Sequence, residues 1–458
     1  MDNVNFTGSA DKILTYAGLN EEDKNKIKSA INNFSALTDQ MSIEDDARRL
    51  RKELNSYFYE LYKVIFFKSI EDTAIPDEIL LFLFFGYIDE KLAGEENVPM
   101  LYAALKSIGL DENMHVFTFY DWLRLIYNGK KDPSVNDFSV DYVTFLRKKR
   151  KEGSITEAQE NSFLRDGKKR VIFEIDNMFK SANKMMSERV TSFVPFFTSK
   201  ALTKPVDKGF LSFDTVNKTL SIIKAIDFSL FYRQTVYTAP ELGVDRAFVQ
   251  VEIMPDVILM PCVGARGAMW QEITGAKRTT PGRFILPIIE EEELSKVLIN
   301  LCGEFRWELC KRVQGARWND LSEKSLTSDY VDYIDTYRKN HELSQEAKER
   351  VKSAMAKHRN SYKEMFVADY MTYIQYESSG AIRLNKLARA ILFNYCPFSK
   401  VIRAGAIATN PQYTQLIEKY KMKNSHENHL FSVLLGRIEK DGHSVPIELK
   451  RHRDFLNA

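Results

Sequence analysis

Cysteine and histidine are scarce in this 458-residue chain, which has four cysteines and seven histidines. The cysteines form no CxxC pair and no zinc-finger spacing. His426 and His429 are three residues apart, whereas the HExxH helix of zinc proteases separates its histidines by four. The sequence therefore predicts no metal site and no cofactor. Such sparse cysteine is typical of a reducing cytoplasm, where thiols behave as small buried hydrophobes.

The chain also lacks a long apolar run. Its most apolar stretch, residues 79–88, is about half of the roughly 20 residues that a membrane span requires. Pro76 and the acidic residues Asp77 and Glu78 precede this stretch and favour a helix start. We therefore expect a buried core helix and no membrane span. No basic and apolar leader is visible near Met1, so we expect a cytoplasmic protein.

An excess of charge of one sign is missing as well. The chain has 65 Lys and Arg against 63 Asp and Glu, a net charge of +2, which disfavours a protein dedicated to coating nucleic acid. The basic run at 147–151 ends a predicted helix, where cations are stabilising, and nucleic-acid binding there is the minor alternative. Tyrosines that recur at helical spacing after Tyr330 are interpreted as core residues.

Signatures of catalysis are absent from the sequence. There is no GxSxG nucleophile motif, no GxGxxG and no GxxxxGK[ST]. Asp256 and Glu272 have the residue types of nuclease carboxylates, but Thr274 stands where such enzymes need a basic residue. We therefore predict no catalytic residue, and whether the protein is an enzyme stays open.

The hydrophobic periodicity changes twice along the chain. Residues 1–195 follow the helical period of 3.6, residues 209–289 contain segments of period 2, and residues 290–458 return to the helical period. The predicted fold is α+β and mainly α. It comprises an N-terminal helical domain (1–195), a small central antiparallel sheet (209–289) and a C-terminal helical domain (290–458) packed on it.

Several strands are predicted inside the central segment. Residues 226–232 and 247–253 alternate between apolar and polar side chains, and 210–213 with 219–223 suggest a further hairpin. Pro255 and Pro261 bracket residues 256–260. Because proline cannot donate to a strand ladder, we expect an edge strand there.

The segment Gly264–Phe284 is the strongest candidate for a binding site. Its glycines allow close backbone approach to a ligand, and its cations with one tryptophan suit a phosphate or nucleotide. A structural loop, whose arginines pair with Glu272 and the acidic run 290–293, is the alternative. The helix after the loop adds an arginine and a second tryptophan. The candidate residues are Arg266, Trp270, Lys277, Arg278, Arg283, Arg306 and Trp307.

Residues 264–272, 280–284 and 305–310 resemble the rear portion of uncharacterised large bacterial proteins, several of which are labelled as carrying a cyclic-nucleotide-binding domain in front. The resemblance covers residues 250–400 and implies a bacterial, intracellular, signalling-linked protein. The front half of this chain has helical periodicity rather than the pattern of a glycine-punctuated β-roll. Cyclic-nucleotide binding is therefore transferred to no residue here.

Together these features predict a non-catalytic intracellular regulatory or scaffold protein that acts through protein–protein interaction with an unidentified partner. A nucleotide- or phosphate-binding protein that uses the Gly264–Phe284 loop, with or without enzyme activity, is the first alternative. Nucleic-acid binding is the second alternative.

Overall fold

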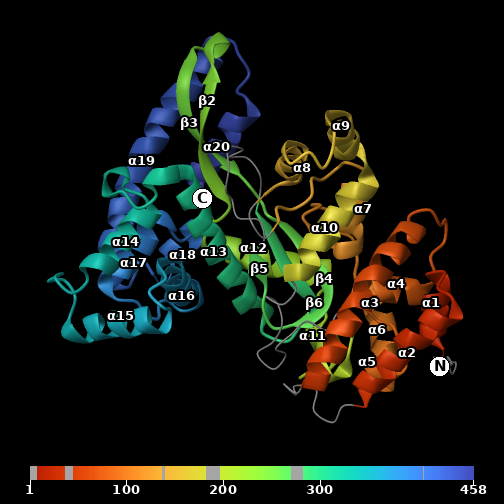
Figure 1. Ribbon diagram of the computed structural model, residues 1–458. Coiled ribbons are helices and arrows are strands. Elements are labelled where there is room, and N and C mark those ends of the chain that lie inside the picture. Colours follow the sequence, from red (N-terminus) through yellow and green to blue (C-terminus); the bar gives the residue numbers. More distant parts are fainter. Residues whose placement is uncertain (1–7, 37–44, 137–139, 182–195, 270–281, 406) are drawn as a thin grey trace. The chain divides into compact units, whose positions relative to one another are not determined.

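A computed structural model describes residues 8–36, 45–136, 140–181, 196–269, 282–405 and 407–458 (Figure 1). Two compact units are present. Unit 1 comprises the described residues within 1–217, 256–272 and 283–297, and unit 2 those within 218–255, 273–282 and 298–458. Helices dominate both units, and the strands form two small sheets, so the predicted α+β, mainly α class is confirmed. The three-part domain division stays a prediction.

Unit 1 begins with a run of helices that the period-3.6 pattern predicted. The helices of this unit are α1 (Ser9–Tyr16), α2 (Glu21–Ser35), α3 (Asp45–Ser69), α4 (Asp77–Phe85), α5 (Glu90–Ala93), α6 (Val98–Ser107), α7 (Phe119–Tyr127), α8 (Tyr142–Lys151), α9 (Glu157–Arg165), α10 (Gly167–Ser181) and α11 (Val206–Gly209). Helix α12 (Phe213–Ile226) then carries the chain into unit 2. The apolar run that excluded a membrane span forms the buried helix α4, as expected.

The sheet of unit 1 has four strands in the order β1-β4-β6-β5. These are β1 (Val116–Thr118), β4 (Asp256–Gly264), β5 (Ala268–Met269) and β6 (Arg283–Glu290). The β1–β4 and β4–β6 pairs are parallel, and only the short β5 runs antiparallel to β6. Every residue of β4 and β6 is buried, as parallel strands covered on both faces require. The central sheet was predicted to be antiparallel, which is wrong for β4 and β6. A strand that is buried on both faces shows no alternation of apolar and polar residues, so the sequence pattern did not reveal these strands.

Strand β4 corrects the expectation of an edge strand between two prolines. It lies inside the sheet, between β1 and β6, and continues through Pro261 to Gly264. The β4–β6 register shifts between Met260 and Val263, so Pro261 falls in a bulge where no ladder hydrogen bond is required of it. The other proline, Pro255, precedes the strand and leaves its ladder intact.

Unit 2 combines a hairpin with helices. Its elements are β2 (Tyr232–Ala239), β3 (Val244–Glu252), α13 (Leu294–Gln314, which begins in unit 1), α14 (Leu326–Thr336), α15 (Gln345–Lys357), α16 (Tyr362–Gln375), α17 (Lys386–Tyr395), α18 (Lys400–Ala404), α19 (Pro411–Lys440) and α20 (Ile447–Asn457). Five of the recurring tyrosines are buried core residues as interpreted, namely Tyr330, Tyr333, Tyr337, Tyr370 and Tyr373. Tyr362 is half-buried, and the interpretation is wrong for Tyr376, which is 45% exposed.

The hairpin β2–β3 is antiparallel and packs against α19 and α20 (Figure 1). Val249 of β3 shares a hydrophobic cluster with Phe431 and Leu435 of α19 and Leu449 of α20. The expected strand at 247–253 is confirmed by β3. The expected strands at 226–232 and 219–223 are wrong, because almost all of these residues belong to α12 and the turn after it. The expected hairpin of 210–213 with 219–223 is also wrong, since Phe210 forms an isolated antiparallel bridge with Ile289 instead. Over the short span of 226–232, alternation alone did not distinguish a strand from a helix end.

No helix in the described ranges is both long enough and apolar enough to cross a membrane.

Candidate functional site

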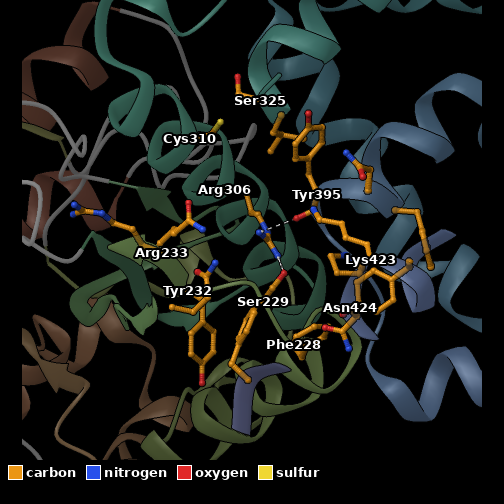
Figure 2. A pocket seen from close by; sticks show the side chains of 18 of the residues that line it. Phe228, Ser229, Tyr232, Arg233, Arg306, Cys310, Ser325, Tyr395, Lys423 and Asn424 are labelled. Atoms are coloured by element: carbon orange, nitrogen blue, oxygen red, sulfur yellow. Dashed lines mark hydrogen bonds between the residues drawn. The ribbon is translucent and has the colours of Figure 1, made fainter. Parts of the chain in front are cut away.

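A pocket of about 520 Å³ opens within unit 2 (Figure 2). Its walls come from the turn after α12, the hairpin β2–β3, and helices α13, α17, α19 and α20, with the residues that start α14. The volume falls in the range of small-molecule sites, which is roughly 300 to 1,000 Å³. Its lining includes five cations and one acid, namely Arg233, Arg306, Lys324, Lys419, Lys423 and Glu427.

A buried ion pair forms the floor of this pocket. Arg306 of α13 donates from Nε to Oδ2 of Asp227 at 3.0 Å, and its Nη2 donates to Oδ1 of the same carboxylate. The Asp227 side chain is fully buried, and Tyr370 Oη donates to it at 2.8 Å. Burial opposes the charge of Arg306, but the adjacent carboxylate raises the pKa of the guanidinium. Each oxygen of Asp227 accepts from more than one group, because Ser229 Oγ also donates to Oδ1 at 3.1 Å.

Arg306 also fixes the backbone around the pocket. Figure 2 shows it between Ser229 and Tyr395, and it donates to the Ser229 hydroxyl and to the Tyr395 carbonyl. The bidentate geometry is one that arginine provides and lysine does not. One side chain thus joins the turn after α12 to the end of α17.

The rim of the pocket is basic. Lys419 and Lys423 lie four residues apart on α19, so they share one face of the helix. Lys324 lies just before α14 with a left-handed φ of 45°, and Tyr395 Oη donates to its carbonyl at 2.8 Å. Within the described residues, the ammonium groups of these three lysines make no ion pair or hydrogen bond. Glu427, one further turn along α19, is the single acid of the lining.

An aromatic wall stands beside these cations. The ring of Phe455 in α20 lies 5.2 Å from that of Phe228 and 4.8 Å from that of Tyr232, measured between centroids. Side-chain amides of Gln250 and Asn424 also line the pocket. The arrangement offers cations for an anion, a ring face for a planar group, and amides for hydrogen bonds in between.

Among the predicted candidates, Arg306 is the one that lines the pocket in the described chain. The adjacent Trp307 points elsewhere. It is 2% exposed, and its ring packs against those of Phe366, Tyr330 and Trp318. It therefore stabilises the helical core of unit 2 rather than facing a ligand in this pocket.

The other candidates belong to the segment around the β5–β6 connection. Arg266 is an exposed residue of unit 1 between β4 and β5. Trp270, Lys277 and Arg278 lie outside the described residues. Arg283 is the first residue of β6 and is 4% exposed.

Arg283 takes part in a buried polar cluster of unit 1. It donates to Ser134 Oγ at 2.6 Å and to the Asp132 carbonyl at 2.8 Å, and its guanidinium lies 4.6 Å from the ring of Trp122. Glu174 accepts from Trp122 Nε1 and from Ser134 at 2.6 to 2.7 Å. Burial lowers the pKa of Arg283, and the carboxylates of Glu174 and Asp256 oppose that effect. The cluster holds the start of β6 to the segment between α7 and α8.

The structure brings forward residues that the sequence did not single out. Lys419, Lys423 and Lys324 are ordinary surface lysines by pattern, and the aromatic wall comes from two segments that are far apart in the sequence, residues 228–232 and α20. The one local signal was the repeat of Lys419, Lys423 and Glu427 along one helical face, which is also common on solvated helices. In the described ranges, no group of three or more His, Cys, Asp or Glu side chains is arranged to hold a metal ion.

The pocket-bearing part of the chain matches a family model. Residues 315–455 match the family described as Domain of unknown function (DUF8509). The match includes the rim lysines Lys324, Lys419 and Lys423, whereas Arg306 and the hairpin β2–β3 lie outside it. No curated protein matches the chain, and no solved structure matches it.

Proposed function

We propose that this protein is a cytoplasmic, non-catalytic regulatory protein that binds a phosphorylated small molecule of the nucleotide class in the unit 2 pocket. The observation that carries the proposal is the set of three lysines, Lys324, Lys419 and Lys423, that border the pocket without an acidic partner among the described residues. The proposal moves the predicted nucleotide or phosphate site from the Gly264–Phe284 loop to this pocket.

The α19 lysines favour a multiply charged anion. Like charges four residues apart on a helix destabilise it by about 0.2 to 0.5 kcal/mol. A phosphate group bound between Lys419 and Lys423 removes that repulsion and gains charge-assisted hydrogen bonds. Arg306 is already neutralised by Asp227, so its role is to hold the pocket floor in place.

The aromatic wall supports a nucleotide over a simple sugar phosphate. Aromatic rings bind planar bases by stacking, and such contacts contribute about 1 to 3 kcal/mol per base. Phe228, Tyr232 and Phe455 supply the rings, and Gln250 and Asn424 supply amides that suit base edges or ribose hydroxyls.

The cytoplasmic and regulatory parts of the proposal have separate support. All four cysteines are free thiols, and Cys262, Cys302 and Cys396 are buried. This usage agrees with a reducing compartment. The resemblance of residues 250–400 to bacterial proteins labelled with a cyclic-nucleotide-binding domain supports a signalling role, in which the bound ligand controls interaction with a protein partner.

A thermal-shift screen followed by calorimetry tests the proposal. The panel contains phosphate, pyrophosphate, and mono-, cyclic and dinucleotides. A ligand at about 100 times its Kd stabilises the protein by roughly 2.7 kcal/mol. The double variant K419A/K423A should weaken binding by about 100-fold, because each lost charge-assisted contact is worth about tenfold. The matched control is K421A/K440A, two exposed lysines of α19 outside the pocket lining, which should bind as the parent does.

A chemical readout then places the ligand. Cys310 lines the pocket and is partly exposed, so a bound nucleotide should slow its alkylation by iodoacetamide. Binding that is equal in K419A/K423A and in the parent, or a ligand that leaves the alkylation rate unchanged, would refute the site. A panel in which nothing shifts the melting temperature would refute the ligand class.

A further inference from the structure

Helices α8, α9 and α10 of unit 1 carry a concentration of positive charge. Residues 142–170 contain nine Lys and Arg against four Asp and Glu, a surplus larger than the net charge of +2 of the whole chain. The segment is a small helical module with a core of its own, in which Tyr142, Leu146 and Phe173 are buried together. The unpaired cations described below are called the basic surface. They are Lys149, Lys151, Arg165, Lys168 and Lys169.

Some cations of this segment have structural roles and are left out of the basic surface. Arg147 and Arg150 of α8 pair with the buried Glu160 of α9 at 4.0 and 3.1 Å. Arg170 donates to the Lys131 carbonyl at 2.7 Å and pairs with Asp132 at 3.1 Å. These contacts fasten the module together.

The five cations of the basic surface do not have ion pairs of this kind. They are exposed, and within the described residues their charged groups form no ion pair. The ammonium group of Lys149 lies 4.7 Å from the centroid of the Phe145 ring, and that of Lys169 lies 5.1 Å from the Phe163 ring. The Lys168 ammonium lies 5.2 Å from the centroid of the Phe67 ring, so three of the five cations lie over half-buried aromatic rings.

Lys168 and Lys169 lie at a position where positive charge does not stabilise the helix. Lys149 and Lys151 end α8, where the helix dipole stabilises cations. Lys168 and Lys169 instead occupy the first turn of α10, where the dipole disfavours positive charge, and no acid lies in that turn. The helix dipole therefore does not account for these lysines, whose ammonium groups lie over the half-buried rings of Phe67 and Phe163.

The two ends of the basic surface are separated by the length of α8. Tyr142 begins α8 and donates from Oη to the carbonyl of Phe163, next to the Arg165–Lys169 group. The other group lies at the opposite end of this ten-residue helix, about 15 Å away. That distance corresponds to about four or five nucleotides at roughly 3.4 Å per strand step.

A nucleic acid fits this surface better than a lipid bilayer. Helices that bind membranes insert an apolar face beside their cations. The apolar face of α8 is already used, because Tyr142 and Leu146 are buried against Phe173 in the core of the module. The surface therefore offers charge and half-buried rings, whereas the apolar face of α8 is already buried.

We infer that the basic surface of α8–α10 binds the phosphate backbone of a nucleic acid without sequence preference. The five cations neutralise up to five phosphates, and the rings of Phe145 and Phe163 lie where bases of a single strand can approach. This inference is independent of the unit 2 pocket.

Fluorescence anisotropy with labelled single-stranded DNA and RNA tests the inference across a salt series. Five contacts predict a slope of about −3.5 for log K against log salt, so affinity should fall on the order of 100-fold between 50 and 200 mM. The variant K168A/K169A should reduce the slope to about −2.1. Its melting temperature should change little, because removing cations from the start of a helix is favourable and offsets the loss of two exposed cation–π contacts worth about 0.5 to 1 kcal/mol each.

The matched control is K352A/K357A, which removes two exposed lysines from α15 of unit 2 and should leave the slope unchanged. Anionic phospholipid vesicles form a second arm of the experiment. Binding to vesicles with none to oligonucleotides would overturn the inference in favour of a membrane surface. Absence of binding at 50 mM salt, or a slope that K168A/K169A leaves intact, would also overturn it.

Discussion

Glu290 allows a quantitative test of the unit 1 sheet. It is the last residue of β6, and its side chain is 1% exposed. Oε1 accepts from the Glu292 amide at 3.0 Å, whereas Oε2 has no hydrogen-bond partner in the described chain. Burial raises the pKa of this carboxyl from 4.5 to about 8, although the Glu292 amide and Lys204 act in the opposite direction. We therefore predict that Glu290 destabilises the sheet as pH rises.

The sign and the size follow from proton linkage. Between pH 4.5 and 8 the folded protein holds a proton on Glu290 that the unfolded chain has released, so stability falls as pH rises. The stability contributed by the protonated Glu290 carboxyl is fully present below about pH 4.5 and is lost progressively as the pH rises to 8. Because one pKa unit corresponds to 1.36 kcal/mol, the free energy of unfolding should fall by roughly 2 to 3 kcal/mol between pH 5 and pH 7. E290Q keeps the shape of the protonated side chain without the titration.

Amide hydrogen exchange on the full chain measures this effect locally. After correction for the intrinsic exchange rate, protection of β4 and β6 in E290Q relative to the parent should rise about 50-fold from pH 5 to pH 7, which corresponds to the same free energy. Peptides from α14 and α17 in unit 2 serve as the internal reference and should be identical in both proteins. A ratio that stays constant across this pH range would refute the burial argument for Glu290.

Three further predictions concern unit 2. D227N leaves the Arg306 charge buried with a weakened partner, so unfolding should become easier by about 3 to 5 kcal/mol in a urea titration, and a change below 1 kcal/mol would contradict the buried pair. W307A removes a ring from the aromatic core and should cost about 3 to 5 kcal/mol in the same assay, with no specific effect on nucleotide affinity beyond that instability. Cys310 should be the first thiol to react with a disulfide reagent in the native protein, because burial raises the pKa values of Cys262, Cys302 and Cys396. C310S should therefore remove the fast phase, and a fast phase that persists would contradict this assignment.

Much of the helical architecture was predictable because it depends on local information. Thr118 caps α7 through its hydroxyl, which accepts from the Asp121 amide at 3.1 Å, and Ser344 caps α15 in the same way. Such caps, together with the 3.6-residue period, are visible in one sequence. The mainly helical class followed from them.

The sheet and the pocket depend on partners that are distant in the sequence. β4 has β1 and β6 as its neighbours, and their pairing decides whether Pro261 ends the strand or occupies a bulge. In the same way, Asp227 lies 79 residues before Arg306, its partner in the pocket floor. Arg306 and Trp307 are neighbours in the sequence, which gives no indication that the first side chain lines the pocket and the second packs in the aromatic core.

The lysines of the rim illustrate a different difficulty. Lys419 and Lys423 have the spacing of any solvated helical face. The rings of Phe228, Tyr232 and Phe455, which come from two other segments, stand beside that face, and residues of the hairpin and of α13 and α17 complete the pocket. Residue type and spacing were available in the sequence, whereas the concave shape was not.

The length of α19 has a mechanical consequence. This helix runs for 30 residues without interruption from Pro411 to Lys440. Its first half presents Lys419 and Lys423 to the pocket, and its second half packs through Phe431 and Leu435 on the hairpin β2–β3. The two regions are about 18 Å apart along one stiff rod. A tilt of α19 that moves Lys419 and Lys423 therefore also moves Phe431 and Leu435, and it disturbs their packing on the hairpin β2–β3.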